Sequence, residues 1–470
     1  MTASATDQRE RELKFDVPDD WRLPDPAALA PDGGRCVTET VRLESAYFDT
    51  ADQSLLHAGL TLRRRTGDID AGWQLKVPDG DARIEIRLPL GGRGVPVELR
   101  DATLGVRGRA VLSPTVTIAT EREIHTLLDA EDVKLAELVV DSVTATAARE
   151  PAGVRRWREV EVELLAGDEK LLARVARWLR KRGATDAAIA SKAARAMGHE
   201  PPARDERGPV ATVMRNYLDA QYEAILRGDI ALRRGTNVVH VTRVATRRYR
   251  SILRVFGAVL DADAAAALDA ELKWFAAVLG EVRDRDVLRG HLESSVAELP
   301  PELDREAVQA AVTTALAAER ERAMAGLDAA MRSKRYFTLL RELGRWHAQL
   351  PLTGRARRAD LAAFLAAAEK AVRKRQAAEH RHPDRDDAVH RIRKAAKRAR
   401  YVGELCAPAL GKPAERLVRR SKDIQTVLGE RQDFVTAAAF LRRVPTSDPA
   451  VAFALGVLYA RERTRAAETR

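Results

Sequence analysis

Cysteine is nearly absent from this chain. Only Cys36 and Cys406 occur among 470 residues, far apart and without a CxxC spacing, which excludes a disulfide framework and a cysteine zinc site. Long apolar runs are also missing, and the opening sequence MTASATDQRERELKF has no apolar signal core. We therefore expect a cytoplasmic protein that does not span a membrane.

Aromatic residues are scarce as well, at 5% of the chain, whereas charged residues make up 32% and hydrophobic residues 45%. This balance is typical of a globular protein, and the length predicts two or three domains. The net charge of +11 favours a polyanionic partner. Charge alone does not distinguish nucleic acid, an anionic membrane surface and polyphosphate.

Charged and apolar residues alternate in the first part of the chain. RERELKFDV, residues 9–17, places Glu10, Glu12 and Lys14 on one face of an extended strand and apolar residues on the other. One such strand is more typical of a sheet with a face in water, but TLRRRTG, WQLKV, RIEIRL and WREVEVEL repeat the pattern. Their charged positions are Arg63, Arg65, Lys76, Arg83, Glu85, Arg87, Glu159, Glu161 and Glu163. The repetition favours an antiparallel barrel with a charged lumen.

A lumen with carboxylates and cations can bind a metal ion and a phosphate together. Carboxylates at every second position bind a hard divalent cation such as Mg²⁺ or Mn²⁺ through oxygen, and Lys and Arg bind phosphate oxygens. A metal-held or carboxylate-oriented water then attacks a phosphate in line, without a covalent nucleophile. The pattern predicts a metal-dependent site for an oligophosphate.

These segments resemble the CYTH family, also called triphosphate tunnel metalloenzymes, whose signature is an ExExK strand. Glu10, Glu12 and Lys14 match the signature, and the block from Tyr47 to Gly67 and the segments WQLK, VVDS and EVEVEL follow in order. The resemblance implies metal ligands at Glu10, Glu12, Asp141, Glu159 and Glu161. It implies phosphate-binding residues at Lys14, Arg63, Arg65, Lys76, Arg122 and Lys192. The implied catalytic residues are Glu10, Glu12, Lys14, Glu159 and Glu161.

Members of this family split inorganic triphosphate or thiamine triphosphate, or cyclise ATP. No adenine or thiamine pocket can be identified in this sequence, and Trp73 and Trp157 are more typical of a barrel core than of ring-stacking residues. Inorganic triphosphate is therefore the expected substrate, with Mg²⁺ or Mn²⁺ as the cofactor.

A change of pattern marks the domain boundary. From Asp168 to Met197 the apolar spacing predicts a helix that ends near Gly183 and packs on or plugs the barrel. HEPPARDERGP, from His199 to Pro209, is a polar, Pro-rich break. We expect the barrel domain at residues 7–199, a linker at 200–209 and a helical domain at 210–468.

The helical part contains a duplicated unit. VHVTRVATRRYRSILRVF at 239–256 reappears as VHRIRKAAKRARYVGEL at 389–405, and KWFAAVLGEVRD reappears as KDIQTVLGERQD. Each copy opens with a His that heads a stripe of cations on one helical face. The duplication predicts two halves, about 210–331 and 332–468, related by a pseudo-two-fold axis, with the stripes facing across a positive channel.

The like charges of a stripe repel one another by roughly 0.2 to 0.5 kcal/mol per neighbouring pair, so an anion should bind there unless acids of neighbouring helices pair with it. The two copies resemble the CHAD domain, the conserved-histidine α-helical domain, whose members bind inorganic polyphosphate. The residues that the resemblance assigns to this binding are His240, Arg243, Arg247, Arg250, Lys273, His390, Arg393, Lys397, Arg400 and Lys422. Arg254 has no counterpart, because Glu404 stands at the matching position.

The expected fold class is α+β with two domains. An N-terminal antiparallel β-barrel, or tunnel, carries flanking helices, and a C-terminal all-α domain consists of two pseudo-two-fold related helical bundles. The expected activity is metal-dependent hydrolysis of inorganic triphosphate in the barrel, with polyphosphate binding by the helices and association with polyphosphate granules. The alternatives are a non-catalytic polyphosphate-binding protein and nucleic-acid binding, which is disfavoured because the stripes contain only Tyr249 and Tyr401 for stacking.

Overall fold

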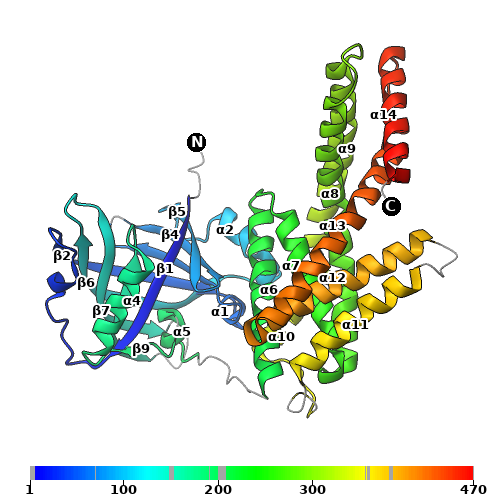
Figure 1. Cartoon of the computed structure of the whole chain (residues 1–470). Coiled ribbons are helices and arrows are strands. Elements are labelled where there is room, and N and C mark those ends of the chain that lie inside the picture. Colours follow the sequence, from blue (N-terminus) through cyan, green and yellow to red (C-terminus); the bar gives the residue numbers. More distant parts are fainter. Residues whose placement is uncertain are drawn as a thin grey trace. The chain divides into compact units, whose positions relative to one another are not determined.

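The computed structural model describes residues 6–68, 70–147, 153–189, 191–199, 208–354, 356, 360–379 and 385–468, with the side chains of residues 6, 379, 385–387, 389, 390 and 427–430 outside the described part. The chain divides into two compact units, Met1–Ala203 and Arg204–Arg470. Figure 1 shows that the first is built mainly of strands and the second of helices.

The strands of the first unit form a closed antiparallel barrel. Their order is β5-β4-β3-β2-β6-β7-β8-β1, and β5 pairs again with β1 to close the ring. A short strand, β9, extends the sheet beside β1. The bounds are β1 Thr6–Val17, β2 Arg35–Asp49, β3 Thr61–Thr66, β4 Gly72–Asp79, β5 Ala82–Pro89, β6 Ser113–Leu128, β7 Lys134–Ala147, β8 Val154–Leu164 and β9 Thr185–Asp186. The barrel expected from the alternating charges is confirmed.

The outward apolar faces of β1, β6, β7 and β8 pack against helix α4, Glu169–Arg180. Phe15 of β1 is fully buried in a cluster that includes Leu172, Val175 and Leu179 of this helix. Asp168 caps the helix by accepting a hydrogen bond from the Leu171 amide at 2.8 Å. Because α4 covers the outside, the charged residues of the same strands are left to face the lumen.

A second short helix, α5, spans Lys192–Ala196 and is capped by Ser191, whose hydroxyl accepts from the Ala194 amide at 3.1 Å. Ala193 and Ala196 pack against a buried cluster that includes Trp157. The helix predicted from residue 168 onward therefore ends at Arg180, and a turn and β9 separate it from α5. The other helices of this unit are η1 Pro26–Leu29, α1 Ser54–His57, α2 Val97–Ala102 and α3 Leu104–Arg107.

The second unit is helical over its described residues. Its helices are α6 Pro209–Arg233, α7 Val239–Val255, η2 Gly257–Val259, α8 Ala262–Ala297, α9 Arg305–Met331, α10 Lys334–Ala348, α11 Leu361–Glu379, α12 Arg385–Leu410, α13 Lys412–Leu441 and α14 Pro449–Glu468. None of the helices in the described ranges has the length and apolar character needed to cross a membrane.

The packing of these helices follows the sequence duplication. The chain packs α6 on α7, α7 on α8 and α8 on α9, and then α11 on α12, α12 on α13 and α13 on α14. Equivalent helices also meet one another, α7 with α12, α8 with α13 and α9 with α14. The two bundles are thus related as the repeat predicts. Helix α10 lies on α6, α8 and α9, so the segment just after residue 331 packs on the first bundle.

Candidate active site and basic groove

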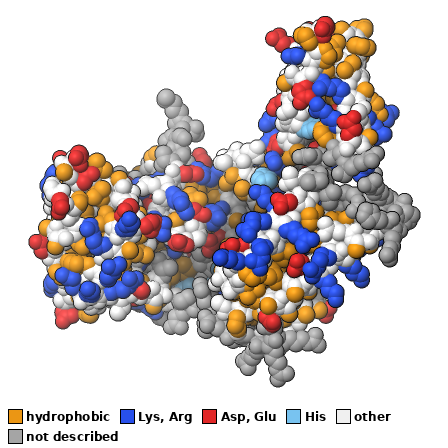
Figure 2. All heavy atoms as spheres, in the orientation of Figure 1, with side chains coloured by type: hydrophobic (Ala, Val, Ile, Leu, Met, Phe, Trp, Pro, Cys, Tyr) orange, Lys and Arg blue, Asp and Glu red, His pale blue; other side chains and the backbone are white. Residues whose placement is uncertain are grey.

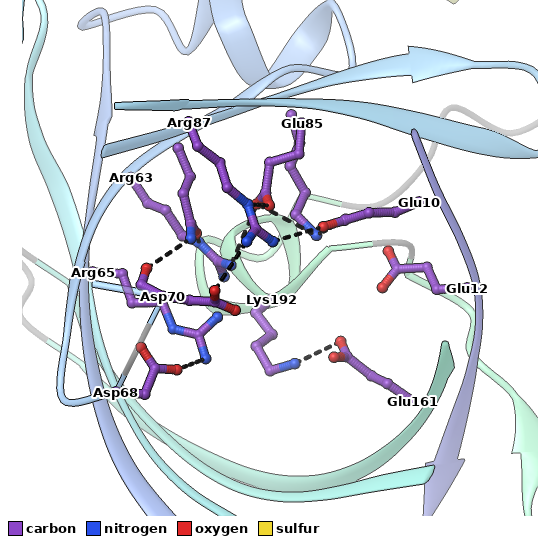
Figure 3. A network of polar contacts seen from close by, with 12 residues as sticks. Glu10, Glu12, Arg63, Arg65, Asp68, Asp70, Glu85, Arg87, Glu161 and Lys192 are labelled. Carbon is purple, nitrogen blue, oxygen red and sulfur yellow. Dashed lines mark hydrogen bonds and ion pairs between the residues drawn. The ribbon is translucent and has the colours of Figure 1, made fainter. Parts of the chain in front are cut away.

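The barrel encloses a cavity of about 500 Å³ that opens among its inward-facing side chains. Acidic and basic residues line it in equal number. Figure 3 shows these side chains converging from strands around the barrel, with Glu10, Glu12 and Glu161 on one side and Arg63, Arg65 and Asp68 on the other. A lumen of this composition is suited to an anion that is accompanied by a cation.

Three carboxylates meet within the barrel wall beside the lumen, and of these only Glu161 lines the cavity. Asp141 of β7 lies directly opposite Glu159 of β8, and Glu161 follows on the same face, because successive side chains of a strand alternate. Oxygen atoms from all three lie within 4.8 Å of one another. The ammonium of Lys192, carried in by α5, lies 2.9 Å from Asp141, 2.5 Å from Glu159 and 2.7 Å from Glu161.

Further hydrogen bonds fix this cluster. Arg122 of β6 donates two parallel bonds to Asp141, at 2.8 and 2.7 Å, and a third to Glu161 at 3.1 Å. Burial raises the pKa of Glu161, but Lys14, Lys192 and Arg122 outweigh it and hold that pKa well below its usual range. The Glu161 carboxylate is therefore ionised, and Arg122 fixes the positions of Asp141 and Glu161.

The donor set fits a hard divalent cation, since closely spaced carboxylate oxygens are the ligands that Mg²⁺ and Mn²⁺ prefer. Glu10 and Glu12, the other expected metal ligands, are not part of the three-carboxylate cluster. Glu10 lies 2.5 Å from the ammonium of Lys76, and Glu12 lies 3.6 Å from that of Lys14. Lys14 connects the two groups, because its ammonium is also 2.5 Å from Glu161.

The opposite wall is rich in guanidinium groups. Arg63 donates to Gln74 at 2.6 Å and to the Tyr47 hydroxyl at 3.2 Å, and Arg65 donates to Asp68 at 2.5 Å. Burial, together with the like charges of Arg63 and Arg122, lowers the pKa of Arg65 to about 10. The positive charge of this wall is therefore only partly compensated.

All six expected phosphate-binding residues of the barrel line the cavity. Asp141 and Glu159 do not line it but lie behind the Lys192 side chain, almost fully buried. Sequence reasoning gave no role to Tyr47, although it lines the lumen within the recognised block. Glu163, one of the charged positions of the alternating strands, also lines the lumen, and burial, with Glu10 and Glu12 nearby, raises its pKa to about 7.

In the helical unit, two adjoining cavities of about 560 and 390 Å³ run between α7 and α8 on one side and α12 and α13 on the other. Both are lined by Arg243, Arg247, Lys394 and Lys397, so we call the pair the basic groove. Figure 2 shows Lys and Arg side chains gathered on the helical unit over the region of these helices. The two stripes thus face a common space.

Positive charge is concentrated in this groove. Burial, followed by the charges of Arg247, Arg393, Arg243 and Arg400, lowers the pKa of Lys397 to about 7. The Nε atoms of Arg243 and Arg393 are buried without a hydrogen-bond partner among the described residues. Buried cations of one sign without partners are costly, which is typical of a site for an anion.

At the far end of the first stripe the alternative left open by the sequence, pairing with an acid of a neighbouring helix, is what the structure has. Asp269 of α8 accepts hydrogen bonds from Arg250 at 3.0 Å and from Arg254 at 2.7 Å. Asp284 lies 3.9 Å from Arg243, consistent with a carboxylate that orients a cation. An acid of a neighbouring helix therefore neutralises the cations at one end of the stripe, and the positive charge that remains lies nearer its middle.

The remaining expected groove residues have different positions. His240, Arg250, Lys273 and Arg393 line one or other of the two cavities. Arg400 and Lys422 line neither cavity, and Arg400 lies 3.3 Å from Glu404. The side chain of His390 lies outside the described residues. Arg283 and His291 line the groove but were not identified from the sequence.

The aromatic residues of the stripes are not available for base stacking. Tyr249 and Tyr401 are each only 1% exposed. In the barrel, Trp73 is fully buried and Trp157 is 6% exposed, and neither lines the lumen.

The two family models that match this chain agree with its division into a barrel unit and a helical unit. The CYTH domain matches residues 8–197 and the CHAD domain matches residues 216–442. Two uncharacterized proteins from strains of Mycobacterium tuberculosis are each 36% identical over 469 residues, which cover 92% of this chain and 88% of theirs. PptA from Streptomyces chartreusis has a TM-score of 0.47 at 25% identity and covers 56% of this chain and 97% of its own. The CHAD domain from the plant Ricinus communis has a TM-score of 0.43 at 27% identity and covers 57% and 92%.

Proposed function

Because this chain belongs to the CYTH and CHAD domain families, joined in one polypeptide, we propose that its barrel hydrolyses inorganic triphosphate with a divalent cation and that its helical unit binds inorganic polyphosphate. The observation that carries the first part is the lumen itself. Glu161, which lines it, belongs to a cluster of three carboxylates suited to a cation, and the other lining residues include buried guanidinium and ammonium groups.

Phosphate oxygens would be held by Lys14, Arg63, Arg65, Lys76, Arg122 and Lys192. Arg65 and Lys76 now contact Asp68 and Glu10, and an incoming phosphate would replace these acids as the partner of each cation. Their burial strengthens each interaction with phosphate, because water does not screen it.

Asp141, Glu159 and Glu161 would hold Mg²⁺ or Mn²⁺, with Glu10 and Glu12 as further ligands from β1. A bound cation neutralises phosphate charge and lowers the pKa of its water. The chain keeps the cluster ready for this role: Arg122 orients Asp141 and Glu161, and the indole of Trp157 donates to Glu159 at 2.6 Å. Glu10, Glu12, Lys14, Glu159 and Glu161 form the proposed catalytic set.

The lining of the lumen favours a substrate without an organic ring. Tyr47 is the one aromatic residue among the lining side chains of the described chain, and it is engaged by Arg63. Apolar lining is limited to a few aliphatic side chains, such as Val41, Ile124 and Val139. A nucleobase or thiazolium ring would find little stacking surface here.

The test is a substrate panel. The purified protein is given inorganic triphosphate, ATP, thiamine triphosphate or long-chain polyphosphate, each with Mg²⁺, with Mn²⁺ or with a chelator, and phosphate release is measured. We expect metal-dependent release that is fastest with inorganic triphosphate. Triphosphate that binds but persists intact with either metal would instead favour a non-catalytic phosphate receptor.

The basic groove supports the second part of the proposal, because Lys397 at its middle has no acidic partner among the described residues and Tyr249 and Tyr401 are each only 1% exposed. Titration of the protein with long-chain polyphosphate should show tight binding that weakens steeply with salt. In competition, polyphosphate should displace single-stranded nucleic acid far better than the reverse. The opposite order of displacement would make the groove a nucleic-acid site.

A further inference from the structure

His291 of α8 lines the basic groove, although no feature of the sequence stripes points to it. One of its ring nitrogens, Nε2, lies 2.7 Å from a carboxylate oxygen of Glu462 on α14. Glu462 is only 1% exposed and lies beyond residues 216–442, the stretch that the CHAD domain matches. A buried acid on the last helix thus contacts a residue of the groove.

The imidazole ring is held from several sides. Ser295, one turn further along α8, donates its hydroxyl to the other oxygen of Glu462 at 2.7 Å. Phe434 of α13 packs edge-on against the imidazole, with ring centroids 5.2 Å apart. Helices α8, α13 and α14 therefore fix the orientation of His291 together, and this is more than a solvated surface histidine requires.

The charge of Glu462 also depends on its contact with His291. Burial raises the pKa of Glu462, but hydrogen bonds from His291 and Ser295 outweigh it and lower that pKa below its usual range. A carboxylate kept ionised in the interior requires a cationic or donating partner. With Nε2 turned toward Glu462, Nδ1 is the ring nitrogen left for the groove, and no described residue forms a hydrogen bond with it.

We propose that His291, positioned by Glu462 and Ser295, is a further phosphate-binding side chain of the basic groove and donates from Nδ1 to a phosphate oxygen of bound polyphosphate. The inference rests on the proposed polyphosphate binding. The charged groups that share this end of the groove are His240, Arg243, Arg283, Asp284, Arg393 and Asp433. Of the described histidines on this wall, His291 is the one with a buried carboxylate behind it, as in a metal-ligating or catalytic His whose second nitrogen is oriented by an acid.

The chain provides a matched control for this inference. His347 of α10 also bonds a carboxylate, with Nδ1 2.8 Å from Asp219, and it stacks on Tyr222. It lines neither cavity of the groove. His291→Ala and His347→Ala therefore remove the same group with the same kind of partner, inside and outside the groove.

The experiment measures the affinity of the full chain for long-chain polyphosphate at several salt concentrations and at pH 6 to 8. His291→Ala should weaken binding about tenfold or more, as for loss of one hydrogen bond to a charged group, and reduce the salt slope by roughly 0.7. His347→Ala should leave both unchanged. Glu462→Gln, which removes the charge behind the ring and leaves the imidazole in place, should weaken binding less than His291→Ala does.

The outcomes are separable. If the wild-type protein binds polyphosphate and His291→Ala binds as tightly, with an unchanged salt slope, the inference is wrong while the proposed function stands. If the wild-type protein does not bind polyphosphate, both fail. Circular dichroism checks the fold of each variant, and His291→Gln, which keeps a donor of similar size, should retain part of the affinity if His291→Ala unfolds the bundle.

Discussion

Replacing Lys397 by methionine should stabilise the helical unit and at the same time weaken its binding of polyphosphate. Lys397 lies on α12 in the middle of the basic groove, and no described acid is ion-paired with it. Burial and four arginines lower its pKa from 10.5 to about 7. The fold therefore bears a charge there that it would be more stable without.

The magnitude follows from this pKa. Each unit of difference corresponds to about 1.4 kcal/mol, so a fall of roughly 3.5 units sets an upper bound of about 5 kcal/mol on the cost of the charged ammonium. The side chain is partly exposed, and water and salt screen the repulsion, so we expect about 1 to 2 kcal/mol to remain. Below about pH 7 Lys397 is charged in both the folded and the unfolded chain, and this cost is present in full. Between pH 7 and 10.5 the folded chain loses the proton first, and the cost declines.

The assay is urea denaturation followed by far-UV circular dichroism, which reports mainly on helix, at pH 6 and at pH 9.5. Lys397→Met should raise the free energy of unfolding more at pH 6 than at pH 9.5. Lys370→Met on the exposed face of α11 is the control and should change stability by less than about 0.5 kcal/mol. Polyphosphate affinity of Lys397→Met should fall about tenfold. A variant that is no more stable at pH 6, or equally more stable at both pH values, would refute the reasoning.

Three other substitutions test particular contacts, and a fourth, Gly290→Ala, is a control. Lys192→Met removes the ammonium that lies 2.5 to 2.9 Å from the carboxylate cluster. The affinity for Mn²⁺, measured by calorimetry, should therefore rise about tenfold, while triphosphate turnover falls. An unchanged affinity would show that this ammonium does not compete with the metal. Arg122→Lys cannot form two parallel bonds to one carboxylate, so phosphate release should slow about 10- to 100-fold, and a rate like the wild type would contradict the orienting role. Gly228→Ala would place Cβ 2.2 Å from the Thr242 hydroxyl and should destabilise the fold by about 1 to 3 kcal/mol in urea. Gly290→Ala, which meets open space within α8, should instead stabilise it by about 0.5 to 1 kcal/mol, and equal effects would exclude the clash as the cause.

The strands that sequence reasoning placed are those in which a charged face alternates with an apolar one. β1, β3, β4, β5 and β8 have this pattern because charged side chains of each line the lumen and apolar side chains on the other face, such as Leu62, Leu75 and Ile86, are buried. β2 gave no such signal, since most of its first half is exposed on both faces. Polar and apolar residues alternate along a strand only when its two faces lie in different environments. Both faces of the first half of β2 lie in solvent, so its sequence does not alternate in this way.

The basic stripes illustrate a second limit. Helical spacing predicted that the cations of α7 share a face, and the duplication predicted that α12 faces them. Spacing does not show which side chains of other helices lie opposite. The pairing of Arg250 and Arg254 with Asp269 and the contact of His291 with Glu462 were therefore not identified. Long-range pairs of this kind depend on how the helices pack.

The most direct test of the central claim is orthophosphate release from inorganic triphosphate by the wild-type protein and by two matched variants in the presence of Mn²⁺. Glu161→Gln removes one charge from the carboxylate cluster, and Glu121→Gln removes one from the exposed face of β6, where Glu121 contacts Arg42. We predict rapid release by the wild type and by Glu121→Gln, and a loss of about 100-fold or more in Glu161→Gln. Equal rates for the two variants, or no release by the wild type, would contradict the claim that the lumen is a metal-dependent triphosphatase site.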